Sequence, residues 1–293
     1  MRRFALALLL LASLSPTRAA AFDLVLSIAN PGAFTPTQLS LLQNSLGPAE
    51  AMWENVVTGY QPGITVGTLN VPITGQASMF GLANAGPTGV VSQGGFQVAT
   101  GGIMNVNLST LESIADFPLN ASIASFPGET VNVLNELIAH EVGHVLGIGT
   151  LWTRLQGGQV PYVNGSGEYR GVHGLAEYRR EFNQPDAEFI PVELAGAASS
   201  ANSHWDQNFR SAEGPTGDPF LEDPRVGVVD SLGRDFGLEL MTAAIDPDYG
   251  APFLSRTTIA SLVDLGFTVV IPEPSSVALL AIAVFGVGRR RDG

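Results

Sequence analysis

The stretch His140-Glu141-Val142-Gly143-His144 decides how the rest of the chain is interpreted. Two histidines four residues apart lie on one face of a helix, where their imidazoles can bind a single Zn²⁺. Glu141 then lies beside the metal and is the candidate general base for a zinc-bound water. The motif therefore predicts one catalytic zinc ion with His140 and His144 as two of its ligands.

The segment around the motif is predicted to be a buried helix. Pro127-Gly128 marks a turn, Thr130 is a reasonable N-cap, and Gly147 and Gly149 end the helix. Polar rings on so apolar a helix cost free energy unless something pairs them, which favours a metal site. The apolar residues expected to bury this helix are Val133, Leu134, Leu137, Ile138, Val142 and Val145.

Upstream of the motif, the sequence predicts strands around one long helix. The helix carries an apolar stripe that includes Trp53, for which a structural role is sufficient. The region 81–102 is glycine-rich and predicts turns and short strands. The other predicted elements are strands over 22–28, 64–73 and 103–108, a helix over 36–60 and a connection over 109–125.

Composition narrows the possible partners and ligands. The 293 residues are 45% hydrophobic, which is enough for a real core. There is no lysine, and 14 arginines face 27 acids, so nucleic acid would be repelled. There is also no cysteine, which excludes disulfides, thiolate metal sites and a cysteine nucleophile. Histidine, aspartate and glutamate remain as metal ligands.

The first 21 residues have the pattern of a signal peptide. Arg2 and Arg3 precede an apolar run over 4–14, and Ala19 to Ala21 supply small residues for cleavage. The apolar run is shorter than the ~20 residues that span a bilayer, which disfavours the alternative of an uncleaved membrane anchor. We expect export, with a mature chain that begins near Phe22.

The far end, residues 271–293, resembles the PEP-CTERM sorting signal of Gram-negative bacteria. Pro272-Glu273-Pro274 is followed by an apolar run over 277–288 and by Arg289-Arg290-Arg291. The resemblance implies transient membrane contact, processing by a sorting transpeptidase, and delivery to the cell surface, the extracellular matrix or the medium. The alternative is a tail anchor with cytoplasmic arginines. Loss of both ends removes six arginines and two acids, which leaves 8 arginines against 25 acids and a formal charge of −17.

The third metal ligand does not follow directly from the motif. His140 to Gly147 form the front of the metzincin signature, whose third ligand normally follows the glycine by three residues. Thr150 occupies that position here. The remaining histidines are His173 and His204, and Glu168 or Glu177 would serve a thermolysin-type site. Gly147 belongs to the metzincin turn and therefore argues against a glutamate ligand. His173 begins a helical segment, 174–182, in a region expected to be solvated.

Further motifs make the sequence similar to the leishmanolysin-like zinc metallopeptidases, metzincins in which a long insertion precedes the third histidine. They are His204-Trp205, Glu239-Leu240-Met241, and a segment over 254–262 followed by Asp264-Leu265-Gly266. The resemblance implies that His204 completes the zinc site with His140 and His144. It also implies that Glu141 is the general base, and that Met241 forms a Met-turn beneath the metal.

The same resemblance implies an α+β, metzincin-like zincin fold. The N-terminal catalytic subdomain, 22–149, would hold a twisted mixed sheet and two long helices, one of them carrying the motif. The C-terminal subdomain, 150–270, would be more irregular and contain the insertion, the third ligand, the Met-turn and a closing helix. The implied function is a secreted or surface-associated zinc endopeptidase that hydrolyses a protein or peptide substrate.

Two departures and two alternatives accompany this hypothesis. The family's type member is cysteine-rich, so this chain must hold its insertion without disulfides. An additional acidic stretch over 211–236 could bind Ca²⁺, although no EF-hand spacing supports it. Its acids are Asp218, Glu222, Asp223, Asp230 and Asp235. The alternative functions are a metzincin-fold surface or matrix binding protein without turnover, and a zinc hydrolase of a non-peptide substrate.

Overall fold

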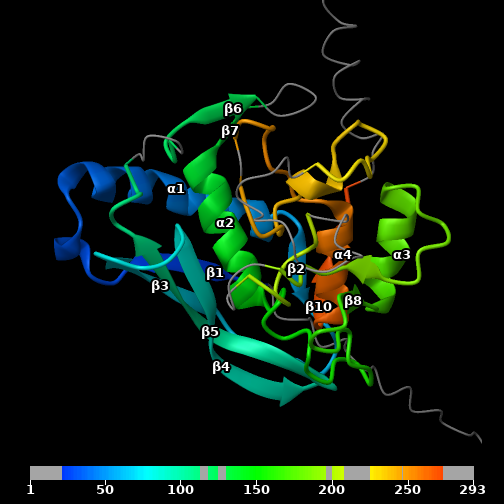
Figure 1. The fold of residues 1–293 in the computed structure, drawn as a ribbon. Helices are drawn as coiled ribbons and strands as arrows, with labels where there is room; N and C mark the ends of the chain where they lie inside the picture. The colour runs from blue at the N-terminus through cyan, green and yellow to red at the C-terminus, as the bar shows by residue number, and fades with distance from the viewer. Residues whose placement is uncertain are drawn as a thin grey trace, which may run out of the picture.

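The computed structural model describes residues 22–112, 118–124, 130–195, 200–207, 225–245 and 247–272. The predicted signal peptide, the sorting signal beyond residue 272, and three of the acids proposed for calcium (Asp218, Glu222 and Asp223) lie outside these ranges. Within them the protein has an α+β fold, drawn in Figure 1. No helix of the described part is long and apolar enough to cross a membrane.

A mixed four-stranded sheet forms the base of the N-terminal half, as predicted. Its strand order is β1 (Leu24–Ile28), β3 (Leu69–Gln76), β5 (Phe96–Asn107) and β4 (Ala83–Gln93). β1 and β5 each pair with β3 in parallel, whereas β4 pairs with β5 antiparallel. β4 is therefore an edge strand of this sheet.

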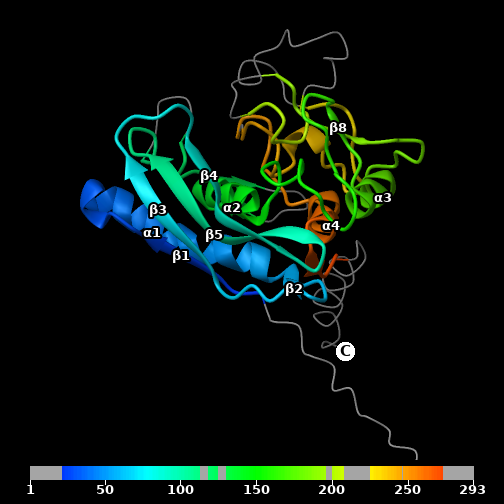
Figure 2. The ribbon, with the colours of Figure 1, turned by 90° about the horizontal axis from the view of Figure 1, so that it is seen from below.

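Two long helices, α1 (Pro36–Glu54) and α2 (Val133–Leu146), cover one face of the sheet (Figures 1 and 2). Alternate residues of β3 are buried beneath them, which is the pattern of a sheet covered on one face. Trp53 of α1 is fully buried, and its indole nitrogen donates a hydrogen bond to the Ala139 carbonyl oxygen of α2 at 2.8 Å. This hydrogen bond helps to hold the two helices side by side on the sheet.

The glycine-rich region contains the longest strands of the fold, so the prediction of turns and short strands was wrong there. Residues 83–107 form a hairpin, β4 and β5, whose partners stay paired along nearly their whole length. Gly102 of β5 lies under α2, where an added Cβ would come within 2.4 Å of Val145 Cγ1. The glycine weakens the strand locally but lets the motif helix lie close against the sheet.

Helix α1 is shorter than the predicted helix over 36–60. It ends at Glu54, and β2 (Val57–Tyr60) follows and pairs antiparallel with β10 (Phe267–Val269). The β-branched residues that follow Asn55 favour a strand, and their partner lies more than 200 residues later in the chain. The strand predicted over 64–73 likewise begins late, at Leu69.

The remaining structure is irregular and is held largely by packed aromatic rings. Trp152 and Trp205 are stacked with ring centroids 4.5 Å apart, and Tyr169 packs against both. The elements of this part are β8 (Glu168–Tyr169), α3 (Val172–Glu181), β9 (Ile190–Pro191), η3 (Phe236–Leu238) and α4 (Arg256–Asp264). η1 (Pro31–Ala33), β6 (Ser122–Ala124) and β7 (Thr130–Asn132) complete the described elements.

Two helical glycines provide a matched test of this packing. An added Cβ at Gly143 of α2 would come within 2.5 Å of Met241 Sδ and 3.2 Å of Trp53 Cζ2, whereas Gly47 of α1 has open space around it. We expect Gly47→Ala to raise the free energy of unfolding by about 0.5–1 kcal/mol. Gly143→Ala should lower it by about 1–3 kcal/mol because the core around it is already filled. Urea denaturation measures both, and equal effects of the same sign would contradict the packing.

Candidate metal centre

Helix α2 presents the motif from a rigid, buried frame. Every residue of the helix except Asn135 is buried. The N-cap is Asn132, whose side chain accepts from the backbone N–H groups of Leu134 and Asn135, so the prediction of Thr130 as N-cap was wrong. Thr130 instead lies in β7. The helix ends as predicted at Gly147, which adopts a left-handed φ of +111°.

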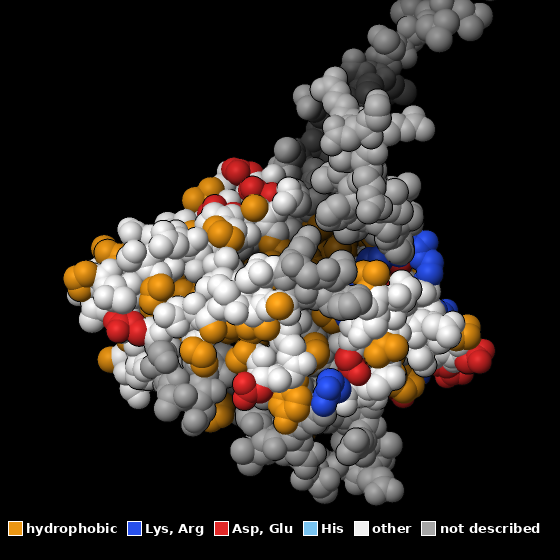
Figure 3. Space-filling model, turned by 90° about the horizontal axis from the view of Figure 1, so that it is seen from above, with side chains coloured by type: hydrophobic (Ala, Val, Ile, Leu, Met, Phe, Trp, Pro, Cys, Tyr) orange, Lys and Arg blue, Asp and Glu red, His pale blue; other side chains and the backbone are white. Residues whose placement is uncertain are grey.

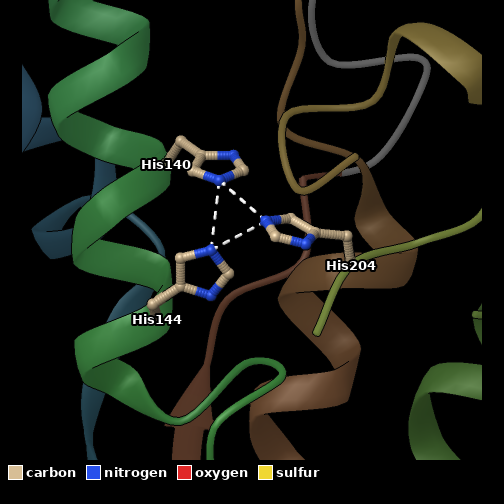
Figure 4. A group of neighbouring side chains, drawn as sticks. All are labelled: His140, His144 and His204. Atoms are coloured by element: carbon tan, nitrogen blue, oxygen red, sulfur yellow. Dashed lines mark hydrogen bonds between the residues drawn. The ribbon is translucent and has the colours of Figure 1, made fainter. Parts of the chain in front are cut away.

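His140, His144 and His204 meet in one buried cluster (Figure 4). The Nε2 atom of His144 lies 3.1 Å from that of His140 and 3.0 Å from that of His204, and the last two are 3.3 Å apart. Each residue is 6% exposed. Within the described ranges this is the one group of three or more His, Cys, Asp or Glu residues that could hold a metal ion.

Backbone carbonyls determine which ring nitrogens face one another. The Nδ1 atoms of His140, His144 and His204 lie 2.6, 3.0 and 2.9 Å from carbonyl oxygens, which can only accept hydrogen bonds. Each Nδ1 therefore carries a hydrogen, and in the neutral ring each Nε2 presents a lone pair to the other two. These carbonyl acceptors belong to Leu240, Ile148 and Ser200, respectively.

A divalent cation fits this arrangement better than protons do. Burial lowers the pKa of all three imidazoles, that of His140 to about 3, so they are neutral at ordinary pH. Three lone pairs that converge without a donor repel one another unless a cation lies between them. Nitrogens bound at about 2.0–2.1 Å to one tetrahedral ion lie roughly 3.3 Å apart, close to the separations observed.

The chain after α2 brings His204 to the motif through several contacts. Trp205, its neighbour, donates its backbone N–H to the Met241 carbonyl oxygen at 3.0 Å and its indole N–H to Thr258 Oγ1 at 2.7 Å. On the other side, Gly149 has a φ of +73°, and an added Cβ there would come within 2.1 Å of the Ser203 carbonyl oxygen. Only a glycine allows the two backbones to pass so closely beside His204.

Thr150, which stands where the metzincin signature places its third ligand, has a different role. Its hydroxyl donates a hydrogen bond to the His144 carbonyl oxygen at 2.6 Å. The same carbonyl oxygen also accepts from the backbone N–H of Gly147 at 3.2 Å, so Thr150 adds a second hydrogen bond at the C-terminal end of α2. The residue supports the backbone of one cluster histidine while the third histidine arrives from residues 200–207.

The predicted Met-turn residue lies against the motif helix. Met241 is completely buried and packs on Gly143, while the carbonyl oxygen of Leu240 accepts from His140. The Glu239 carboxylate accepts from the backbone N–H of Met241 at 2.6 Å and from both the backbone and the hydroxyl of Ser255. Since Ser255 is the N-cap of α4, this turn is fixed to the closing helix as well as to α2.

Glu141, which follows His140 in the sequence, is a buried residue of α2. It is 4% exposed, and its Oε2 has no hydrogen-bond partner in the described structure. Burial raises the pKa of this carboxyl to about 8. A divalent cation held by the neighbouring histidines would lower that pKa, because an opposite charge favours the ionised carboxylate.

The alternative third ligands lie elsewhere. His173 is exposed at the start of α3, as expected for a solvated residue, and its backbone N–H donates to Asp264 Oδ1. The Glu168 carboxylate pairs with Arg170, and that of Glu177 pairs with Arg180 and Arg256. None of the three residues belongs to the histidine cluster.

Of the acids considered for calcium, the structure describes Asp230 and Asp235. The Asp235 carboxylate accepts from the backbone N–H groups of Val226, Gly227 and Gly237. The Asp230 carboxylate accepts from the backbone N–H groups of Leu232 and Arg234 and pairs with the Arg234 side chain at 2.7 Å. These contacts stabilise the loop itself, and the calcium hypothesis gains no support from them.

Comparison with known proteins identifies the C-terminal end. Residues 270–291 match the PEP-CTERM protein-sorting motif. This motif implies processing by an exosortase, and it indicates a protein exported and sorted to the cell surface in Gram-negative bacteria. A search of curated proteins finds no match to the chain. The main body is therefore interpreted from its own geometry.

Glu136 is a buried acid on the helix that carries the motif, and the sequence patterns did not single it out. It lies one helical turn before His140, is 4% exposed, and makes no hydrogen bond or ion pair within the described structure. Burial raises the pKa of its carboxyl to about 7. The available signal was its position four residues before His140, on an otherwise apolar helix.

The raised pKa of Glu136 predicts a pH-dependent stability. Below the ordinary value of 4.5 the carboxyl is protonated in both states, and between 4.5 and about 7 it ionises only on unfolding. This residue's contribution therefore lowers the free energy of unfolding as pH rises through that window. Glu136→Gln should remove this contribution. The free energy of unfolding of the variant, compared with that of wild type, should therefore rise by about 1–3 kcal/mol between pH 4.5 and pH 8. Urea denaturation with EDTA present tests this, and parallel pH profiles would contradict it.

Proposed function

We propose that the protein is an exported, zinc-dependent endopeptidase with a metzincin-like fold, acting at the cell surface, in the extracellular matrix or in the surrounding medium. One observation carries the proposal. Three neutral imidazoles converge through Nε2 lone pairs, and the helix that supplies two of them also supplies the buried, unpartnered carboxylate of Glu141. The sorting motif supports the location.

Zinc is the metal that this donor set suits best. Three protein ligands with a fourth position left open are typical of catalytic zinc, and imidazole is among its commonest ligands. With no cysteine in the chain, thiolate sites are absent. Bound at His140, His144 and His204, zinc would act as a Lewis acid that lowers the pKa of a water molecule and polarises a substrate carbonyl.

The chain's own residues supply orientation and proton transfer. The carbonyl oxygens of Leu240, Ile148 and Ser200 fix the three rings and increase the basicity of each Nε2. Glu141, when ionised, takes a proton from the attacking water and delivers it to the leaving amine. Because the nucleophile is a water molecule and not a side chain of the enzyme, no covalent enzyme intermediate is required.

The edge strand β4 supports an extended peptide as the substrate. It packs against α2 and pairs on one side with β5. Its Gly86 faces Thr150, with an added Cβ 3.9 Å from Thr150 Cγ2, so the strand passes the end of α2 that carries His144. A peptide that adds to the free edge of β4 would run close to the histidine cluster.

The test combines metal analysis with proteolysis of the purified mature protein. We expect one zinc per chain and chelator-sensitive cleavage of casein or gelatin. Glu141→Gln should keep its zinc but lose at least about 1000-fold in kcat/KM, because the proton-transfer group is gone. His204→Gln should lose zinc and activity together, whereas the matched variant His173→Gln should retain both.

Two outcomes would contradict the proposal. Full proteolysis by Glu141→Gln would exclude its role as general base. Zinc at one per chain without cleavage of any peptide in a library would point instead to a surface binding protein that keeps the metal site without turnover.

A further inference from the structure

Charge is distributed very unevenly along the mature chain. Between residues 22 and 153 there is no lysine or arginine, and the first basic side chain is that of Arg154. The same segment contains eight acids: Asp23, Glu50, Glu54, Glu112, Asp116, Glu129, Glu136 and Glu141. On the face shown in Figure 3, the basic side chains accordingly lie toward the side of α3, and none lies over α1.

Glu136 lies in the same row of side chains as the motif histidines. Residues 136, 140 and 144 are spaced four apart on α2, so their side chains follow one another along one face of the helix. Glu136 is 4% exposed, which is close to the 6% of each cluster histidine. The residue as a whole is thus as little exposed as the three histidines, and it lies one turn before His140.

Nothing in the described structure pairs this carboxyl. The ion pairs of Arg170, Arg180, Arg234 and Arg256 all go to other acids. Acids are favoured in the first turn of a helix by its dipole, and Glu136 occupies the first turn of α2. That explanation is incomplete, because the Asn132 side chain already accepts from the backbone N–H groups of Leu134 and Asn135.

We infer that Glu136 determines substrate specificity by receiving a cationic side chain, lysine or arginine, of a peptide bound at the histidine cluster. This rests on the proposed peptidase function and names the class of substrate. A buried carboxylate without a partner is unfavourable, and a cation brought by the substrate supplies the missing partner. Residues 22–153 supply no basic side chain, and Glu136 takes part in none of the ion pairs of the described residues, which leaves that role to the ligand.

The net negative charge of the chain between the two terminal signals also favours basic substrates. Between the two terminal signals the chain carries 8 arginines against 25 acids. Such an excess of negative charge attracts cationic peptides and raises their rate of encounter. The long-range field favours basic substrates in general, whereas Glu136 would select a basic residue at one defined position relative to the scissile bond.

The experiment uses peptides with blocked termini that carry lysine or norleucine at each position around the cleaved bond. Norleucine keeps the four-carbon chain of the lysine side chain but lacks its terminal ammonium group. Wild type should prefer lysine at one position by at least about tenfold in kcat/KM, and Glu136→Gln should reduce that ratio to near one. Glu188→Gln, which removes the same charge from an exposed site, should keep the preference.

A binding measurement separates this inference from the proposed function. Fluorescence anisotropy of the same peptides is measured on Glu141→Gln and on the double variant that also carries Glu136→Gln. Preference for lysine in the first and its loss in the second would support the inference even if no peptide were cleaved. The inference is overturned if wild type cleaves or binds lysine and norleucine peptides equally at every position. It is also overturned if Glu136→Gln, folded and zinc-loaded, keeps the preference.

Discussion

The convergence of three imidazole lone pairs is the constraint on which the rest of the site depends. Each ring of the cluster has its Nδ1 committed to a backbone carbonyl, so the Nε2 atoms must face one another as acceptors. Neutral rings cannot hydrogen-bond to each other in that state, and burial disfavours protonation. A cation at their centre turns this repulsion into attraction, which is why the geometry points to a metal.

Much of the surrounding structure serves to hold those carbonyls and rings in place. Leu240 belongs to a turn that Glu239 fixes to the N-terminus of α4. Ile148 follows the left-handed end of α2, and residues 200–207 are anchored through Trp205. Three segments distant in sequence thus supply acceptors to one cluster, and the aromatic packing behind Trp205 gives them a common support.

Sequence patterns predicted the fold where local physics determines it. The apolar periodicity of α2 and the alternation of β1 are local, and both elements form within two residues of their predicted bounds. The hairpin of β4 and β5 was missed because its glycines are poor strand formers, and their value appears only when Val145 of α2 packs against Gly102. The end of α1 was missed because β2 pairs with a strand from the far end of the chain.

The candidate site was likewise predicted only in part from the sequence. His140 and His144 were predicted to share a helix face from their spacing alone, whereas His204 entered through resemblance, and the structure brings the three together. The capping role of Thr150 and the carbonyl acceptors could not be read from sequence, since they depend on how the backbone turns after α2. Glu136 was overlooked because an acid in the first turn of a helix is ordinary until its burial is known.

Zinc K-edge absorption of the purified, zinc-loaded protein tests the central claim most directly. The account predicts three imidazole nitrogens at about 2.0–2.1 Å and one further light-atom ligand. In His204→Gln one imidazole should be lost from this coordination shell, or the zinc should be lost altogether, while His173→Gln should give the wild-type spectrum. A spectrum with two imidazoles, or one unchanged by His204→Gln, would contradict it.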